Sequence, residues 1–269
     1  MGTFKLKWLI GQLTSIKQVR VNFTTLKNPM DFYLGAIIKL FPFFEKVIIT
    51  LKFKDGYRIK IYDFMSFYIY AEIFIDKCYD VQLAKEDPLI IDVGANTGFF
   101  ALRMKQLYPK SKILCFEPYP PCINHLNETI IINQLKDVEI KPLAISDKSG
   151  KCKLFIHPTN IGGHSLFSEN ASNIYVEIES VSLLDVLENI RDHSKCDLLK
   201  LDCEGAEFSI IKSINMNSSK YFEHIIYEPT YNSYDIKDLH NHLKKLAYNV
   251  ETQHSLYHAY KSTNSSSVN

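Results

Sequence analysis

The sequence carries almost no net charge. It has 31 Lys and Arg residues against 30 Asp and Glu, a formal net charge of +1 over 269 residues. A chain without a global positive field has no electrostatic support for binding a polyanion, so we expect no nucleic-acid partner. Its hydrophobic fraction of 46% is that of an ordinary globular protein, and its length is sufficient for one large core.

The sequence also lacks Cys-x-x-Cys pairs and a secretion signal. Most of its six cysteines lie in apolar runs, which favours buried free thiols in a reducing compartment over a disulfide framework or a zinc site. The apolar run after Lys7 covers only residues 8–10 and no cleavage site follows it. Together these absences predict a cytoplasmic protein.

No apolar run is long enough to span a bilayer. The longest, Phe32 to Phe44, is interrupted by Lys39 and Pro42. We interpret it as a buried helix, with an interfacial anchor as the alternative, so peripheral membrane contact through residues 1–45 stays open. A non-catalytic module bound to a membrane partner is therefore one function to be weighed.

Residues 1–86 are expected to form a cap of helices and one β-hairpin. The helices are predicted over residues 1–45. Two alternating runs, 47–53 and 57–62, flank an Asp-Gly turn, which is a strong hairpin signal.

Residues 87–260 alternate short apolar runs with helical segments, which is typical of a doubly wound, mostly parallel α/β sheet. The predicted core strands are 89–93, 113–116, 138–146, 196–201 and 222–227. The predicted helices are 99–108, 122–135, 206–214 and 236–247. Residues 150–182 are predicted to be an insertion of two strands around a glycine-bearing loop, and residues 261–269 a disordered tail.

The first core strand runs into a glycine-bearing turn, Asp92–Gly98, that leads into a helix. Gly94 permits a tight turn and close approach of the backbone to a ligand, and the helix start offers free N–H groups. The Gly-x-x-x-Gly spacing differs from the Gly-x-Gly-x-x-Gly turn of dinucleotide-binding domains. The acid two residues before the first glycine suits a ligand with an ammonium group, such as S-adenosylmethionine.

A second acid, Glu117, ends the next strand. It lies roughly 20 residues beyond the glycines, where an acid is placed to accept hydrogen bonds from ribose hydroxyls. The two strand-end acids together indicate a cofactor that contains adenosine.

Five ordered segments resemble the FkbM-type methyltransferases: Asp92–Gly98, Phe116–Pro118, Ala144–Gly150, Val181–Asp185 and Leu199–Glu207. The resemblance covers about residues 88–230. It implies a class I methyltransferase (Rossmann-like) fold, S-adenosylmethionine as cofactor, and methyl transfer to a hydroxyl. The acceptor would be a small molecule or glycan, with a sugar, glycan or glycolipid precursor as the expected class.

The same resemblance assigns residues to the cofactor. Those of the methionine end and its turn are Asp92, Gly94, Asn96, Thr97, Gly98 and Phe99. Glu117 would bind the ribose, with Pro118 beside it. Ser146 and Asp147 would lie by the adenine, where a carboxylate can accept from the exocyclic amine. Turn chemistry is an alternative explanation of Asp147.

Three residues are candidates for assisting the displacement at the methyl group, in which a base can take the proton of an acceptor hydroxyl. Asp202 ends a buried strand, although it could instead cap the next helix. Glu204 could likewise be an acid favoured by a helix dipole. His164, in the insertion loop, titrates in a suitable range. Asp202 and Glu228 could together hold a magnesium or calcium ion, but nothing in the sequence supports a metal.

The alternative enzyme class is an NAD-dependent nucleotide-sugar oxidoreductase. It would require the Gly-x-Gly-x-x-Gly turn, which this sequence lacks. The Tyr-x-x-x-Lys pair of short-chain reductases occurs as Tyr257 and Lys261, at the C-terminal end and far from the expected core helix. The oligomeric state is not predicted.

Overall fold

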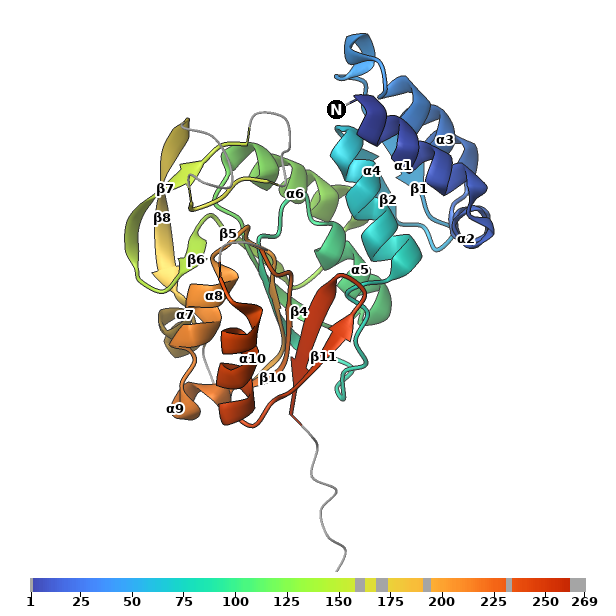
Figure 1. Cartoon of the computed structure of the whole chain (residues 1–269). Helices are drawn as coiled ribbons and strands as arrows, with labels where there is room; N and C mark the ends of the chain where they lie inside the picture. Colours follow the sequence, from blue (N-terminus) through green and yellow to red (C-terminus); the bar gives the residue numbers. More distant parts are fainter. Residues whose placement is uncertain (1, 158–162, 168–173, 191–194, 231–233, 262–269) are drawn as a thin grey trace, which may run out of the picture. The chain divides into compact units, whose positions relative to one another are not determined.

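The computed structural model describes residues 2–157, 163–167, 174–190, 195–230 and 234–261 (Figure 1). The chain divides into two compact units. One comprises Met1–Asp80 with Glu128–Leu135, and the other Val81–Asn127 with Lys136–Asn269. The first unit thus ends at Asp80 rather than at residue 86 and includes a later segment that the sequence did not indicate. The tail predicted over 261–269 lies, beyond Lys261, outside the described residues.

The N-terminal unit contains the predicted helices and hairpin. Its elements are α1 (Gly2–Thr14), α2 (Ile16–Thr25), α3 (Pro29–Ile38), the 3-10 turn η1 (Pro42–Phe44), β1 (Ile49–Lys52), β2 (Arg58–Ile61), α4 (Phe64–Tyr70) and the π-helical turn η2 (Ala71–Asp76). The two strands pair antiparallel, with Ile49 opposite Ile61. Asp63 starts α4 through a capping box with Ser66, which satisfies free N–H groups at the helix start.

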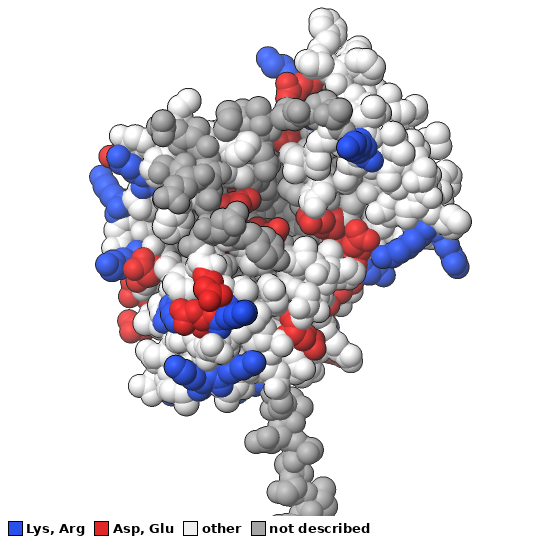
Figure 2. Space-filling model, in the orientation of Figure 1, with Lys and Arg blue, Asp and Glu red and all other residues white. Residues whose placement is uncertain are grey.

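The core of this unit is aromatic. Phe32 of α3 packs edge-on against Phe67 and also contacts Tyr70, with ring centroids 5.3 and 5.2 Å away. The buried Asn22 side chain accepts from the Tyr70 hydroxyl (2.8 Å) and donates to Tyr33 (3.2 Å), so its polar atoms are satisfied inside the core. Outside this core, the surface over α1 and α3 is also largely uncharged (Figure 2).

The second unit is built on a seven-stranded sheet of order β11-β12-β10-β9-β3-β4-β5. Its strands are β3 (Leu89–Val93), β4 (Lys112–Phe116), β5 (Val138–Lys141), β9 (Cys196–Leu201), β10 (Phe222–Tyr227), β11 (Asn249–Gln253) and β12 (Leu256–Tyr260). From β10 to β5 all pairings are parallel, and β12 runs antiparallel to both of its neighbours. The prediction of a mostly parallel sheet is confirmed, whereas the hairpin of β11 and β12 was not predicted.

The helices of this unit follow the strands in alternation. They are α5 (Phe99–Leu107), α6 (Pro120–Asn133), α7 (Leu183–Asn189), α8 (Glu207–Ser213), α9 (Met216–Ser219) and α10 (Ile236–Lys245). The four predicted helices are confirmed with shifts of one or two residues at most ends, and the short α7 and α9 were not predicted. The end of α6, from Glu128, is assigned to the N-terminal unit, where the Glu128 carboxylate accepts from Lys60 and from the Tyr62 hydroxyl.

The strand order reverses between β3 and β9. The chain goes from β3 outward to β4 and β5, and then returns to the other side of β3 to form β9 and β10. In doubly wound sheets a ligand crevice lies at such a switch point, outside the carboxyl ends of the strands. We therefore expect a ligand site among the residues that follow β3, β4 and β9.

The prediction of one strand over 138–146 was wrong. The segment forms two strands in different sheets, β5 and β6 (Ala144–Ser146), separated by Pro142. Proline has no N–H to donate to a strand ladder, so the main sheet cannot continue through it. The strand β6 pairs instead with β8 (Tyr175–Ser182), which also pairs with β7 (Gly150–Phe155), so the predicted insertion is part of a second, three-stranded sheet (Figure 1).

Candidate functional site

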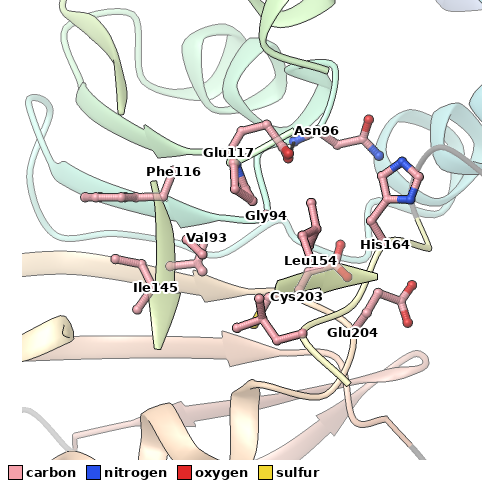
Figure 3. A pocket seen from close by; sticks show the side chains of 14 residues that line it. Val93, Gly94, Asn96, Phe116, Glu117, Ile145, Leu154, His164, Cys203 and Glu204 are labelled. Atoms are coloured by element: carbon pink, nitrogen blue, oxygen red, sulfur yellow. Dashed lines mark hydrogen bonds between the residues drawn. The ribbon is translucent and has the colours of Figure 1, made fainter. Parts of the chain in front are cut away.

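A cavity lies at the carboxyl ends of β3, β4 and β9, which is where doubly wound sheets bind small molecules. Its lining residues are Val93, Gly94, Asn96, Phe116, Glu117, Pro118, Ala144, Ile145, Leu154, His164, Leu166, Asp202, Cys203 and Glu204. Figure 3 shows the apolar Phe116, Val93 and Ile145 at one end, and the polar Asn96, His164 and Glu204 toward the other. The cavity therefore has an apolar end and a polar end.

Gly94 brings two strand ends into direct contact. Its φ of 76° is in the left-handed region, and a Cβ built there would lie 1.8 Å from the backbone oxygen of Asp202. The Gly94 N–H donates to the Phe116 carbonyl at 3.0 Å, which ties the turn to β4 as well. Only glycine fits this position, because both the conformation and the space exclude a side chain.

A buried lysine, Lys200 of β9, binds the turn at Gly94 from within the sheet. Its ammonium lies 3.1 Å from the Asp92 carboxylate and 3.5 Å from that of Asp202, and it donates to the Gly94 carbonyl at 2.8 Å. Burial by itself lowers the pKa of Lys200, but the attraction of Asp92 and Asp202 outweighs it and raises that pKa above its usual range. The sequence analysis did not single out Lys200.

Asp92 occupies a different position from the one predicted for it. Its side chain is fully buried and is not among the residues that line the cavity. A cation of the same chain, Lys200, lies beside it. Asp92 therefore acts on the site through Lys200, which in turn holds the Gly94 carbonyl.

Glu117 does line the cavity. Its two carboxylate oxygens accept from the backbone N–H groups of Asn96 and Tyr119, each at 2.9 Å. Burial raises the pKa of Glu117 to about 7, although the hydrogen bonds from Tyr119 and Asn96 oppose the shift. A fixed carboxylate with free lone pairs is a fitting acceptor for the hydroxyls of a ribose.

The segment after β9 is held by a buried acid, Glu207. Its carboxylate accepts from the N–H groups of Cys203 (2.8 Å) and Gly205 (2.9 Å). These bonds support a bend in which Glu204 and Gly205 both have positive φ, 54° and 116°. Glu207 thus shapes the loop, which is a more specific reason for an acid there than the helix dipole.

The loop presents Glu204 to the cavity. Burial, followed by the nearby carboxylates of Asp202 and Glu207, raises the pKa of Glu204 to about 7. The Glu204 carbonyl accepts from the Ser165 hydroxyl at 2.6 Å, which links the loop to the segment that carries His164. Asp202, Glu204 and His164, predicted separately, are brought together at one cavity.

The hydrogen bonding of His164 defines which ring nitrogen carries the proton. Its Nδ1 accepts from the backbone N–H of His157 at 3.0 Å, which leaves the proton of the neutral ring on Nε2. Burial, and to a lesser degree His157, lowers the pKa of His164 to about 4. Nε2 has no hydrogen-bond partner among the described residues. Near neutrality His164 is therefore a hydrogen-bond donor and not a base.

Several predicted cofactor residues lie away from the lining. Gly98, with φ of 85°, starts α5, while the adjacent Thr97 and Phe99 are buried. Ser146 donates to the Asp147 carboxylate at 3.0 Å, and neither residue lines the cavity; the preceding pair of β6, Ala144 and Ile145, does so instead.

The residues that the sequence analysis missed are mainly apolar: Val93, Phe116, Ala144, Ile145, Leu154, Leu166 and Cys203. Val93 and Phe116 each immediately precede a turn at the end of a core strand, so strand ends were a usable signal for these two. Leu154 of β7 and Leu166 carried none, because they reach the cavity through the second sheet. Among the described residues, no group of three or more His, Cys, Asp or Glu is placed to hold a metal ion.

Comparisons with known proteins agree on one family. The model of the methyltransferase FkbM domain matches residues 92–250. The methyltransferase sdnD of Sordaria araneosa is 32% identical over 190 residues, covering 60% of this chain and 73% of that protein. The 2-O-methyltransferase NoeI of Sinorhizobium fredii is 38% identical over 81 residues, covering 30% of this chain and 32% of that protein.

A solved methyltransferase FkbM from Methylobacillus flagellatus is 15% identical, with a TM-score of 0.49, and the match covers 65% of this chain and 44% of that one. A likeness of this size carries no argument about function. The family match and the topology of the main sheet instead agree in giving a class I methyltransferase (Rossmann-like) fold. The chain belongs to the FkbM family of S-adenosylmethionine-dependent methyltransferases.

Proposed function

We propose that this methyltransferase acts on a hydroxyl of a sugar, glycan or glycolipid precursor. The observation that carries the proposal is the convergence of a donor, His164, and a carboxylate of pKa about 7, Glu204, on one cavity beside Glu117. An alcohol must lose a proton when it is methylated, and these groups supply what that requires. The similarity to NoeI, a 2-O-methyltransferase, supports the choice of oxygen as acceptor.

The residues present fit S-adenosylmethionine. Glu117 would bind the ribose hydroxyls, and the apolar end formed by Phe116, Ile145 and Val93 would enclose the adenine. Asn96, whose Oδ1 has no hydrogen-bond partner among the described residues, would accept from the ammonium of the methionine moiety. When bound, this cofactor supplies an electrophilic methyl group on a sulfonium.

The roles at the acceptor follow from protonation states. His164 donates from Nε2 to the acceptor molecule and so orients it. Glu204, partly ionised near neutrality, takes the proton from the acceptor hydroxyl as the oxygen attacks. Asp202 is the weaker candidate for this step, because its carboxylate already lies 3.5 Å from the ammonium of Lys200.

Two variants test the proposal. Glu204→Gln is expected to lower kcat by roughly 10²–10⁴-fold, the usual contribution of a general base, while the Kd of S-adenosylhomocysteine by isothermal titration stays unchanged. The matched control is Glu177→Gln, an exposed carboxylate of β8 outside the cavity lining, which should leave both quantities unchanged.

The acceptor class is tested with radiolabelled S-adenosylmethionine and a panel of sugars, glycans and glycolipid precursors. Label in an alkali-stable ether is the expected product. Label found only on nitrogen or carboxyl acceptors would overturn the proposal.

A further inference from the structure

The N-terminal unit exposes most of the apolar side chains that the molecule leaves in solvent. Among the described residues, 14 of the 21 exposed large hydrophobic side chains lie between Phe4 and Ile48. Scattered exposed apolar residues are normal on a protein surface, but a concentration of this kind marks an interaction site.

These side chains form stripes on two helices. On α1 they are Leu6, Ile10 and Leu13, and on α3 they are Met30, Leu34 and Ile37, in both cases at i, i+4 and i+7, which is one face of a helix.

Other faces of α1 and α3 are already used in the core. Leu9 of α1 is 3% exposed and Phe32 of α3 is fully buried. The ring of Trp8 packs against that of Phe32, with centroids 6.2 Å apart. The exposed stripes are therefore additional apolar faces and do not result from an incomplete core.

An aromatic turn follows α3. Phe43 of η1 is 91% exposed, and Phe41 and Phe44 are exposed beside it. The turn is anchored from beneath, because the buried Lys39 donates to the carbonyls of Tyr62 (2.6 Å) and Glu45. A fixed, protruding group of aromatic rings is suited to the interface between water and lipid headgroups.

Charge distinguishes this region from the rest of the chain. Residues 1–48 contain seven Lys and Arg against two Asp and Glu, a net charge of +5, while residues 49–269 have a net charge of −4. The basic side chains exposed in this region are Lys7, Lys17, Arg20, Lys27 and Lys46, of which Lys17 pairs with Asp76. Figure 2 shows uncharged surface over α1 and α3 with basic side chains at its margin.

We propose that the apolar stripes of α1 and α3, together with the Phe41–Phe44 turn, bind the surface of membranes that contain anionic lipid. Apolar faces bordered by Lys and Arg are the pattern of interfacial helices, and each basic residue near an anionic surface adds to binding. A second copy of the chain fits less well, because two surfaces with an excess of basic side chains would repel one another. Within the described residues, no helix is long and apolar enough to cross a bilayer.

Vesicle flotation with the full chain tests the proposal. Vesicles of phosphatidylcholine with added phosphatidylglycerol should bind the protein, vesicles of phosphatidylcholine alone much less, and salt should weaken the binding. The triple variant Ile10→Ser, Leu34→Ser, Phe43→Ser should lower the partition coefficient at least about tenfold. The control Met216→Ser removes an equally exposed side chain (66%) from the other unit and should change nothing.

Trp8 gives a second readout, because it is the only tryptophan and lies on α1. Brominated phospholipid in the anionic vesicles should quench its fluorescence in the wild type and much less in the triple variant. If the triple variant is unfolded by circular dichroism, the single variant Phe43→Ser carries the test, with an expected loss of roughly threefold.

Three outcomes would overturn the proposal: undiminished vesicle binding by a folded variant, equal binding to both kinds of vesicle, or a dimer in solution that the same substitutions dissociate while vesicles bind nothing.

Discussion

Two neighbouring strand ends of the main sheet, at Asp92 on β3 and at Glu117 just after β4, look alike in the sequence and differ in the structure. Both acids are buried, at 0% and 7% exposure. Asp92 faces the ammonium of Lys200, whereas Glu117 is held by two backbone N–H groups and lines the cavity. Which acid lines the cavity is thus decided by what the adjacent strand places beside it, here a lysine of β9.

The largest effect that tests this difference between the two acids is expected when the cation beside Asp92 is removed. Lys200→Met should destabilise the protein by about 3–5 kcal/mol, because it leaves Asp92 buried without its partner. Urea unfolding measures the change. The double variant Lys200→Met, Asp92→Asn should recover part of the loss; a double variant no more stable than the single one would show that the pair is not the cause.

The next effect concerns the turn that joins the two ends. Gly94→Ala should cost about 2–3 kcal/mol and weaken S-adenosylhomocysteine binding, because the new Cβ meets the Asp202 carbonyl in a backbone of positive φ. The matched control is Gly56→Ala, at a φ of 104° with nothing within 4 Å, which isolates the conformational cost at about 1 kcal/mol. Equal losses in the two variants, by urea unfolding, would contradict a close contact at Gly94.

A smaller effect is expected at Glu117, the acid that lines the cavity. Glu117→Gln should weaken S-adenosylhomocysteine by about 10-fold or more in isothermal titration, the cost of losing hydrogen bonds to a charged acceptor. The free protein should also lose about 1–3 kcal/mol of stability, because one of the two backbone N–H groups then faces the amide NH₂, which cannot accept its hydrogen bond. Unaltered affinity would mean that Glu117 does not contact the cofactor.

The smallest effect is a dependence of stability on pH. Burial raises the pKa of Glu117 and of Glu207 to about 7, above their ordinary value of 4.5, so the folded state binds these protons more tightly than the unfolded state. The stability they contribute is therefore present at low pH and is lost as the pH rises from about 4.5 to about 7. Urea unfolding across this range should show a shallower decline in Glu117→Gln than in the wild type, and parallel curves would refute the shift.

The buried framework was accessible from the sequence. Strands β3, β9 and β10 have the predicted bounds, because most of their residues are apolar, as expected of strands covered on both faces. The hairpin of β11 and β12 escaped prediction, because Asn249–Gln253 is a polar edge strand whose pattern does not differ from that of a loop.

Part of the site was not predictable because it depends on contacts between distant residues. Lys200 is an ordinary charged residue in the sequence, and only the pairing of β3 with β9 places it beside Asp92. The proton position on His164 depends in the same way on the backbone of His157. Pro142, by contrast, was a visible signal for the break between β5 and β6 that the prediction passed over.

Because β6 leaves the main sheet at Pro142, the two walls of the cavity belong to separate hydrogen-bonded ladders. Gly94 and Glu117 stand on the main ladder, while Ile145 and Leu154 stand on the smaller one. Substitutions in the three-stranded sheet can reshape one wall of the cavity without shifting the strand register of the main sheet, which forms the other wall. The architecture thus lets the shape of one cavity wall vary while the turn at Gly94 and the position of Glu117 stay fixed.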